Sequence, residues 1–203
     1  MATAKLRPFR QIDENDVVNL FAFDGVDVDA GAIVKLETSS AKSWSVDSNF
    51  STDSINNNYG NTVSDRYGVT ARVSLADSGE AVLGMLLFGV KEVDENGEKL
   101  IWHPRKAHEM QVSLSGQAVP VVTRGIVLVN GITATLQPNS EAIAPGVRLF
   151  AGDNGAIMTH ADVDGGIFNA GTVWKDGYLG YCLGKDDGNG NVLIKLEPGR
   201  LGH

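Results

Sequence analysis

The stretch GYLGYCLGKDDGNGNVLIKLEP, residues 177–198, holds the pattern that decides the fold. An apolar run at residues 178–183 leads into a turn of Asp, Gly and Asn at 186–191, and a second run alternates apolar and polar side chains from 192 to 196. Apolar runs on either side of a Gly-Asn-Gly turn are typical of a β-hairpin. The sequence therefore predicts two antiparallel strands joined by a tight turn.

The same plan occurs earlier, between residues 80 and 103. An apolar run at 81–90 is followed by a turn at 94–97 and by Lys99-Leu100-Ile101-Trp102, which we expect to be the second strand of this hairpin. Both apolar runs contain Leu-Gly at matching places, Leu83-Gly84 and Leu179-Gly180.

The likeness continues upstream of both hairpins. Residues 30–36 resemble residues 144–150, and each segment follows an apolar strand that ends in glycine, at 20–25 and at 126–131. Three elements thus recur in the same order, which indicates an internal duplication. Two arrangements agree with it: two related β modules, or one barrel built from two halves.

Composition sets limits on the class of protein. The chain has 203 residues, 42% of them hydrophobic, which suffices for a core. No apolar run approaches the ~20 residues of a membrane span, and the polar start predicts no secretory signal. One cysteine rules out an internal disulfide framework. A net charge of −8 argues against direct nucleic-acid binding, because phosphate contacts need Lys and Arg.

The fold class predicted from these patterns is all-β, with two related β-barrel or β-sandwich modules and one or two short helices at most. The 24 glycines suit a chain with many tight turns. We expect an extended N-terminal arm at residues 1–12, a first module at 13–104 and a second module at 105–203. The first module carries a long polar insertion at 44–68.

Two segments supply the candidate partner-binding residues. The arm carries three cations and an aromatic ring around Pro8, and it either frays or becomes ordered on a larger acidic partner. The insertion is rich in Ser, Asn, Asp and Thr, and loops of this length are usually functional or packed on a neighbour. It either packs on a neighbouring subunit or its own barrel, or binds sugars through its aromatic faces. The candidates are Lys5, Arg7, Phe9, Arg10, Trp44, Phe50, Tyr59 and Tyr67.

We find no catalytic, cofactor-binding or metal-binding constellation in the sequence. Cys182 lies inside an apolar strand and is expected to be a buried, inert thiol. His103 and His108 lack the spacing of metal ligands. The turn at 187–191 imitates the start of a calcium loop, but its twelfth position is Pro198, which has no carboxylate. The chain is therefore expected to be a non-enzyme without a cofactor.

Residues 118–199 resemble the head-decoration, or cement, proteins of tailed bacteriophages. Those proteins often show an apolar strand after Arg-Gly, an (Ala/Pro)-Gly-Val-x-Leu strand, and a closing pattern of Gly-x-x-Leu followed by a glycine turn and a Val-x-Ile-x-Leu strand. In this chain they are Arg124-Gly125-Ile126-Val127, Pro145-Gly146-Val147-Arg148-Leu149, Gly177-Tyr178-Leu179-Gly180 and Val192-Leu193-Ile194-Lys195-Leu196. The long polar insertion departs from the family pattern, and so leaves the docking mode open.

This resemblance implies a structural protein on the outer capsid surface of a virion, made in the host cytoplasm. Its partners would be the major capsid protein and further copies of itself, with a trimer favoured over a dimer. Neither nucleic acid nor a membrane would be bound directly. Two alternatives remain: a carbohydrate-binding module that uses the aromatic insertion, and another virion β protein of the tail or baseplate.

Overall fold

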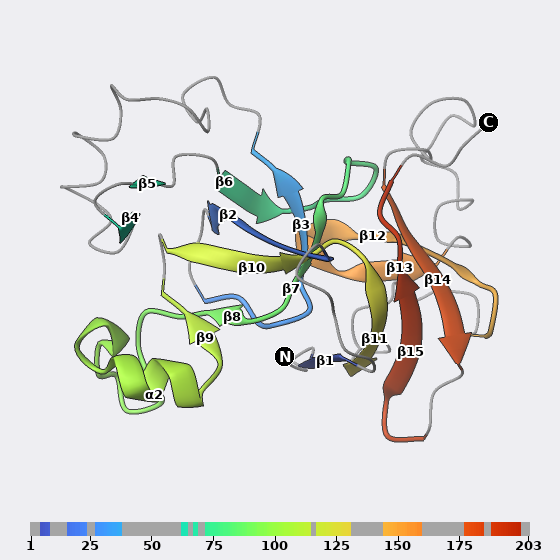
Figure 1. Ribbon diagram of the computed structural model, residues 1–203. Helices are drawn as coiled ribbons and strands as arrows, with labels where there is room; N and C mark the ends of the chain where they lie inside the picture. Colours follow the sequence, from blue (N-terminus) through green and yellow to red (C-terminus); the bar gives the residue numbers. More distant parts are fainter. Residues whose placement is uncertain are drawn as a thin grey trace.

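The structure is a computed structural model that describes residues 5–8, 16–23, 27–37, 62–64, 67–68, 72–114, 117–130, 144–159, 177–184 and 188–199. Most of it is β-structure, so the predicted all-β class is confirmed (Figure 1). The strands are β1 (Lys5–Pro8), β2 (Val17–Phe23), β3 (Ile33–Leu36), β4 (Thr62–Ser64), β5 (Tyr67–Gly68), β6 (Arg72–Leu75), β7 (Gly84–Leu86), β8 (Gly89–Val90), β9 (Val112–Ser113), β10 (Ala118–Val122), β11 (Gly125–Asn130), β12 (Arg148–Ala151), β13 (Ile157–Thr159), β14 (Tyr178–Gly184) and β15 (Asn191–Leu196). The helices are η2 (Leu100–Trp102), α2 (Pro104–Glu109) and η3 (Asp153–Gly155).

The strands form two main assemblies. Five of them close into a barrel in the order β10-β2-β6-β3-β7, and six form a sheet in the order β1-β11-β15-β14-β12-β13. Figure 1 shows the barrel strands beside the sheet, with β14 and β15 on the far side from α2. Two short pairs, β4-β5 and β8-β9, lie outside both assemblies.

The predicted hairpin at 177–198 is present as β14 and β15. The two strands pair antiparallel, with Cys182 opposite Ile194 and Gly180 opposite Leu196. A β-bulge between Cys182 and Gly184 shifts the register before the turn. On β15, Val192, Ile194 and Leu196 are buried and the residues between them are half-buried, which is the alternation that the sequence predicts.

Four strands of the barrel correspond to four strands of the sheet, and the corresponding strands are paired in the same order. The order β2-β10-β7-β3 in the barrel corresponds to β11-β15-β14-β12 in the sheet. The registers match as well: Val34 of β3 lies opposite Gly84 of β7, and Leu149 of β12 lies opposite Gly180 of β14. These are the segments and the Leu-Gly glycines that the sequence comparison aligned. We call residues 16–122 the first half and residues 125–197 the second half.

The turns that lead into β3 and β12 are also alike. The amide of Gly31 donates to the carbonyl of Leu86, and the amide of Gly146 donates to the carbonyl of Cys182, both at 2.8 Å. Leu86 and Cys182 each lie two residues after the matched glycine of β7 or β14. Both turn glycines have positive φ, 96° and 89°, a conformation that side chains with a Cβ rarely adopt. The turns therefore require glycine at the same place in each half.

One strand prediction is wrong, and its correction shows how the first half is built. Residues 99–102 do not form the second strand of a hairpin: Leu100–Trp102 is the 3-10 helix η2, and α2 begins at Pro104. The strand that corresponds to β15 is β10, which pairs with β7. The hairpin of the first half therefore contains an insertion between β7 and β10, whereas residues 185–190 alone separate β14 from β15 in the second half.

The strand pairing does not follow the predicted boundary between modules at residues 104 and 105. Strand β10 lies after that boundary and pairs with β2 and β7, which lie before it. The amide of Thr123 then donates to the carbonyl of Asp16, and the chain passes directly from β10 into β11.

The buried apolar side chains form two clusters. One fills the barrel: Phe23, Val34, Val73, Leu86, Val90, Val119 and Val121. The other joins the inward face of the second half to residues of the first, among them Ile33, Met85 and Val122. These three lie in one cross-strand row, because Met85 pairs with both Ile33 and Val122. The row lies on the outer side of the barrel, so the second half covers the first.

The matching row of the second half has a different chemistry. The residues at the same register are Arg148, Tyr181 and Lys195, with Tyr181 opposite both of the others. Arg148 is exposed and the other two are half-buried. Lys195 lies over the Tyr181 ring, with Nζ 5.3 Å from the ring centroid, and is paired with Glu197 at 3.1 Å. One face of the repeated sheet is thus apolar and covered in the first half, but polar in the second.

Candidate functional site

The insertion between β7 and β10 forms a separate lobe, which we define as residues 88–114 and call the inserted lobe. It contains β8, η2, α2 and β9, and Figure 1 shows it at the end of the molecule opposite β14. Hydrogen bonds between Val28 and Val90, 2.9 and 2.8 Å long, attach the lobe to the body. The chain enters the lobe through β8 and leaves it through β9 toward β10, and β8 and β9 pair in parallel.

A buried ion pair organises the interior of the lobe. The Asp94 carboxylate is fully buried and accepts hydrogen bonds from Lys106 Nζ and from the amides of Asn96 and Glu98, the latter two at 2.8 Å. The hydrogen bond from Lys106 is the main cause that holds the pKa of Asp94 below its ordinary value, and the same contact raises the pKa of Lys106. The loop 94–98 is therefore fixed to α2 by one carboxylate.

This framework presents an exposed apolar patch. Trp102 is 76% exposed, Ile101 37% and Val93 36%. Val93 pairs with Lys99 in an isolated bridge, and η2 begins at the next residue, so the three side chains come from adjoining backbone. We call Val93, Ile101 and Trp102 the Trp102 patch. Leu100, between them in sequence, is fully buried and anchors the turn.

The patch has polar neighbours in sequence. Lys99, His103 and Arg105 are exposed, and His103 lies 3.9 Å from the carboxylate of Glu98. An exposed tryptophan with apolar neighbours and a polar rim is the usual composition of a protein-binding hot spot. Within the described ranges, the other large apolar side chains that are exposed are Leu20 and Leu36, and both belong to the barrel.

The predicted partner-binding residues fall mostly outside the part of the chain that the structure describes. This holds for Phe9, Arg10, Trp44, Phe50 and Tyr59. The structure places the others only by their backbone.

Of these others, Lys5 and Arg7 belong to β1, which pairs with β11, so this part of the predicted arm is an edge strand of the six-stranded sheet. Tyr67 lies in β5, which pairs with β4. The Trp102 patch was missed from the sequence, because Ile101 and Trp102 were interpreted as part of the second strand of a hairpin. Pro104 was a signal for the helix that follows, because proline favours the first position of a helix and α2 begins there.

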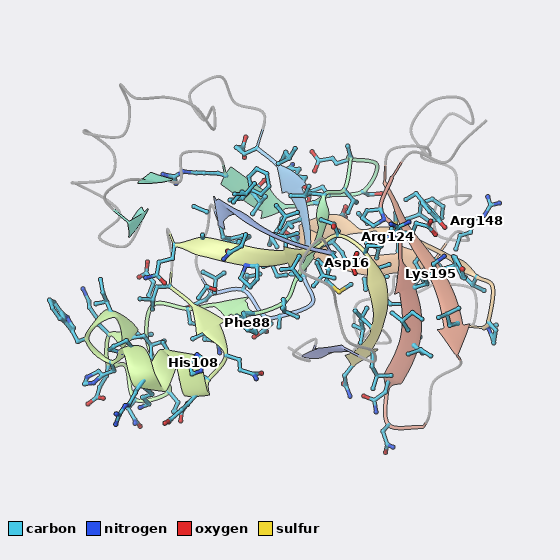
Figure 2. The ribbon with its side chains drawn as sticks, in the orientation of Figure 1. Asp16, Phe88, His108, Arg124, Arg148 and Lys195 are labelled. Carbon is cyan, nitrogen blue, oxygen red and sulfur yellow. The ribbon has the colours of Figure 1, made fainter. Side chains whose placement is uncertain are left out.

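The structure also locates the residues considered for chemistry. Cys182 is fully buried, its Sγ lies 3.0 Å from the carbonyl of Gly184, and burial raises its thiol pKa. His108 lies on α2 in the inserted lobe (Figure 2), whereas Cys182 belongs to β14 at the other end of the molecule. Among the described residues, no three His, Cys, Asp or Glu side chains gather as metal ligands would.

Figure 2 shows Arg124, Arg148 and Lys195 on the side of the molecule that the second half forms, away from the lobe. None of the helices in the described ranges has the length and apolar character needed to cross a bilayer. Comparison with protein families, curated proteins and solved structures found no match to this chain.

Proposed function

We propose that this chain is a structural virion protein that binds the outer surface of a phage capsid and stabilises contacts between capsid subunits. The observation that carries the proposal is the Trp102 patch: an exposed tryptophan, with the partly exposed Ile101 and Val93 on adjoining backbone, on a lobe inserted between β7 and β10. Its partners would be the major capsid protein and further copies of the chain.

The build of the lobe supports a role in protein binding. The Asp94–Lys106 ion pair and the buried Leu100 hold η2 in place before any partner arrives. Binding by a rigid patch loses less conformational entropy than binding by a flexible loop. A tryptophan buries roughly 150–250 Å² in all, and Trp102 is 76% exposed, so covering it removes roughly 110–190 Å² of surface from water. At about 25 cal/mol per Å², this is a gross gain of about 3–5 kcal/mol per copy.

The position of the resemblance to decoration proteins also supports the proposal. Its four motifs overlap β11, β12, β14 and β15. These four strands have counterparts in the first half. The family-like sequence therefore belongs to the repeated framework, while the inserted lobe is particular to the first half. In a cement protein, the framework would supply stiffness and the insertion would supply contact surface.

A capsid-binding assay tests the proposal. Trp102→Ala removes the centre of the patch from an exposed position, so the fold should be kept while the affinity for purified expanded capsids falls at least tenfold, or about 1.4 kcal/mol. Leu20→Ala is the matched control, because Leu20 is 69% exposed but lies on β2, outside the lobe. Capsid binding that is equally strong in both variants and in the parent chain would refute the role of the patch.

The exposed ring of Trp102 also favours a second candidate, a carbohydrate-binding module, because aromatic faces stack on sugar rings. A glycan array separates the two candidates. Binding of a glycan by the parent chain that is lost in Trp102→Ala or in Trp44→Ala, together with no binding to capsids, would replace the cement hypothesis with this one.

A further inference from the structure

The two halves differ in the strand that pairs with one edge of β2 in the first half and of its counterpart, β11, in the second. In the first half, β2 pairs with β10 on one side and with β6 on the other, and both belong to that half. In the second half, β11 pairs with β15 on one side and with β1 on the other. Strand β1 comes from outside the second half, and residues 9–15 connect it to β2 in the barrel. The slot beside β11 is thus filled by a terminal segment.

β11 and β1 contribute unequally to the fold. Val127 and Val129 of β11 are buried in the core, so β11 remains in place with the sheet. Without a neighbour, β11 would expose a row of unpaired N–H and C=O groups, which recruit another strand. β1 has four residues and ends at Pro8, which has no N–H to extend the ladder. A short edge strand that pairs with one neighbour detaches at low free-energy cost.

We propose that β1 is an exchangeable strand: residues 5–8 of one copy bind β11 of a second copy, in the register seen within one chain. The same backbone hydrogen bonds form in both arrangements, so the connecting segment and the concentration decide between them. A short connection holds the strand near its own slot at an effective concentration of about millimolar. The chain therefore pairs with its own β1 in dilute solution and exchanges strands when copies are crowded to a similar density.

Exchange links neighbouring copies without a new interface. It does not depend on a capsid, so its test needs only the full-length chain. Arg7 and Leu128 are register partners, and cross-strand pairs place their Cβ atoms about 5 Å apart, within reach of a disulfide. Chains with Arg7→Cys are mixed with isotopically labelled chains with Leu128→Cys, oxidised, and analysed by mass spectrometry.

The proposal predicts disulfides between differently labelled chains, with a yield that rises steeply as the protein concentration approaches about 1 mM. The control pairs Arg7→Cys with Lys195→Cys, since Lys195 lies on β15 and pairs with Ile126 and Tyr181 rather than with β1. The buried Cys182 does not compete. If the mixture of Arg7→Cys and Leu128→Cys chains gives no more disulfide between chains than the Lys195→Cys control does, at any concentration up to about 1 mM, the proposal is overturned.

A complementation experiment tests the slot itself. A chain without residues 1–8 should bind a synthetic peptide of residues 1–12, and the peptide should slow hydrogen exchange at the β11 amides. The same peptide with Leu6→Pro, which lacks one donor, is the control. A folded truncated chain that does not bind the peptide at millimolar concentration refutes the slot. If the truncated chain aggregates, the cysteine experiment on full-length chains decides.

Discussion

Replacing the matched glycines of β7 and β14 tests whether the two halves share one register. A Cβ on Gly84 would lie 2.9 Å from Cγ1 of Val121 and closer still to the carbonyl oxygen of Val122. A Cβ on Gly180 would collide with the carbonyl oxygen of Lys195. Lys195 occupies in the second half the position that Val122 has in the first. In both strands the obstacle is backbone of the neighbouring strand, which does not move aside as a flexible side chain would.

The size of the effect of Gly84→Ala follows from this geometry. To admit the methyl group, β7 must move away from β10, which weakens the pairing of Met85 and Leu86 with Val122 and Val121. Two hydrogen bonds at about 1 kcal/mol each and overpacking of about 1–3 kcal/mol give a loss of roughly 3–5 kcal/mol. For a chain of 150–250 residues, each kcal/mol lowers Tm by about 2–4 °C, so we expect a decrease of about 6–20 °C.

The assay is thermal unfolding followed by circular dichroism. Gly180→Ala should lower Tm at least as much, because its φ of +152° adds backbone strain. Gly199→Ala is the control: a Cβ there meets nothing within 4 Å, and the expected change is within about 0.5 kcal/mol. If Gly84→Ala unfolds at the same temperature as Gly199→Ala, the close approach of β7 and β10 is wrong, and the shared register fails with it.

Three further predictions concern the contact between the halves, the lobe and the thiol. Gly155→Ala should lower Tm more than Gly199→Ala does, because Gly155 has φ +72° and its Cβ would lie 2.8 Å from Cδ2 of Leu75. Lys106→Met leaves the Asp94 carboxylate buried without a cation, so Tm should fall at neutral pH. Because the folded-state pKa of Asp94 is lowered, its contribution is present above the unfolded pKa and is lost as pH falls through the folded value, so the difference from the parent should shrink below pH ~4. Cys182 should react with a thiol reagent only after denaturation, and labelling of the folded chain would contradict its burial.

Local patterns were enough to predict the all-β class and the hairpin of the second half. Its two strands are adjacent in the sequence, and the turn chemistry lies between them. The apolar strand predicted at residues 20–25 overlaps β2, and the one predicted at 126–131 overlaps β11. In each case the decisive residues lie within one short window, where side-chain periodicity and turn propensity act directly.

The partner of β7 could not be found in this way. The strand that completes the hairpin of the first half is β10, which follows the whole inserted lobe and contains Pro120. Residues 99–102 are nearer in sequence and equally apolar, so they appeared to be the better candidate. Contacts between residues far apart in the sequence distinguish the two segments. Leu100 is buried within the lobe and Trp102 is exposed on it, whereas β10 pairs with β2 as well as with β7. The Trp102 patch was missed for the same reason.

The corresponding rows of the two halves differ in chemistry, and the difference limits which surfaces can stack. In the first half, the row Ile33, Met85 and Val122 is apolar because the inward side of the second half covers it. In the second half, Arg148 and Lys195 occupy the same row, and their charges would have to be buried if a further unit stacked there in the same way. Burying charges that lack new partners is costly, so this row acts as the polar outer face that ends a stack of repeats. The association of copies that we propose would then use other surfaces, the Trp102 patch on the lobe and the strand slot beside β11.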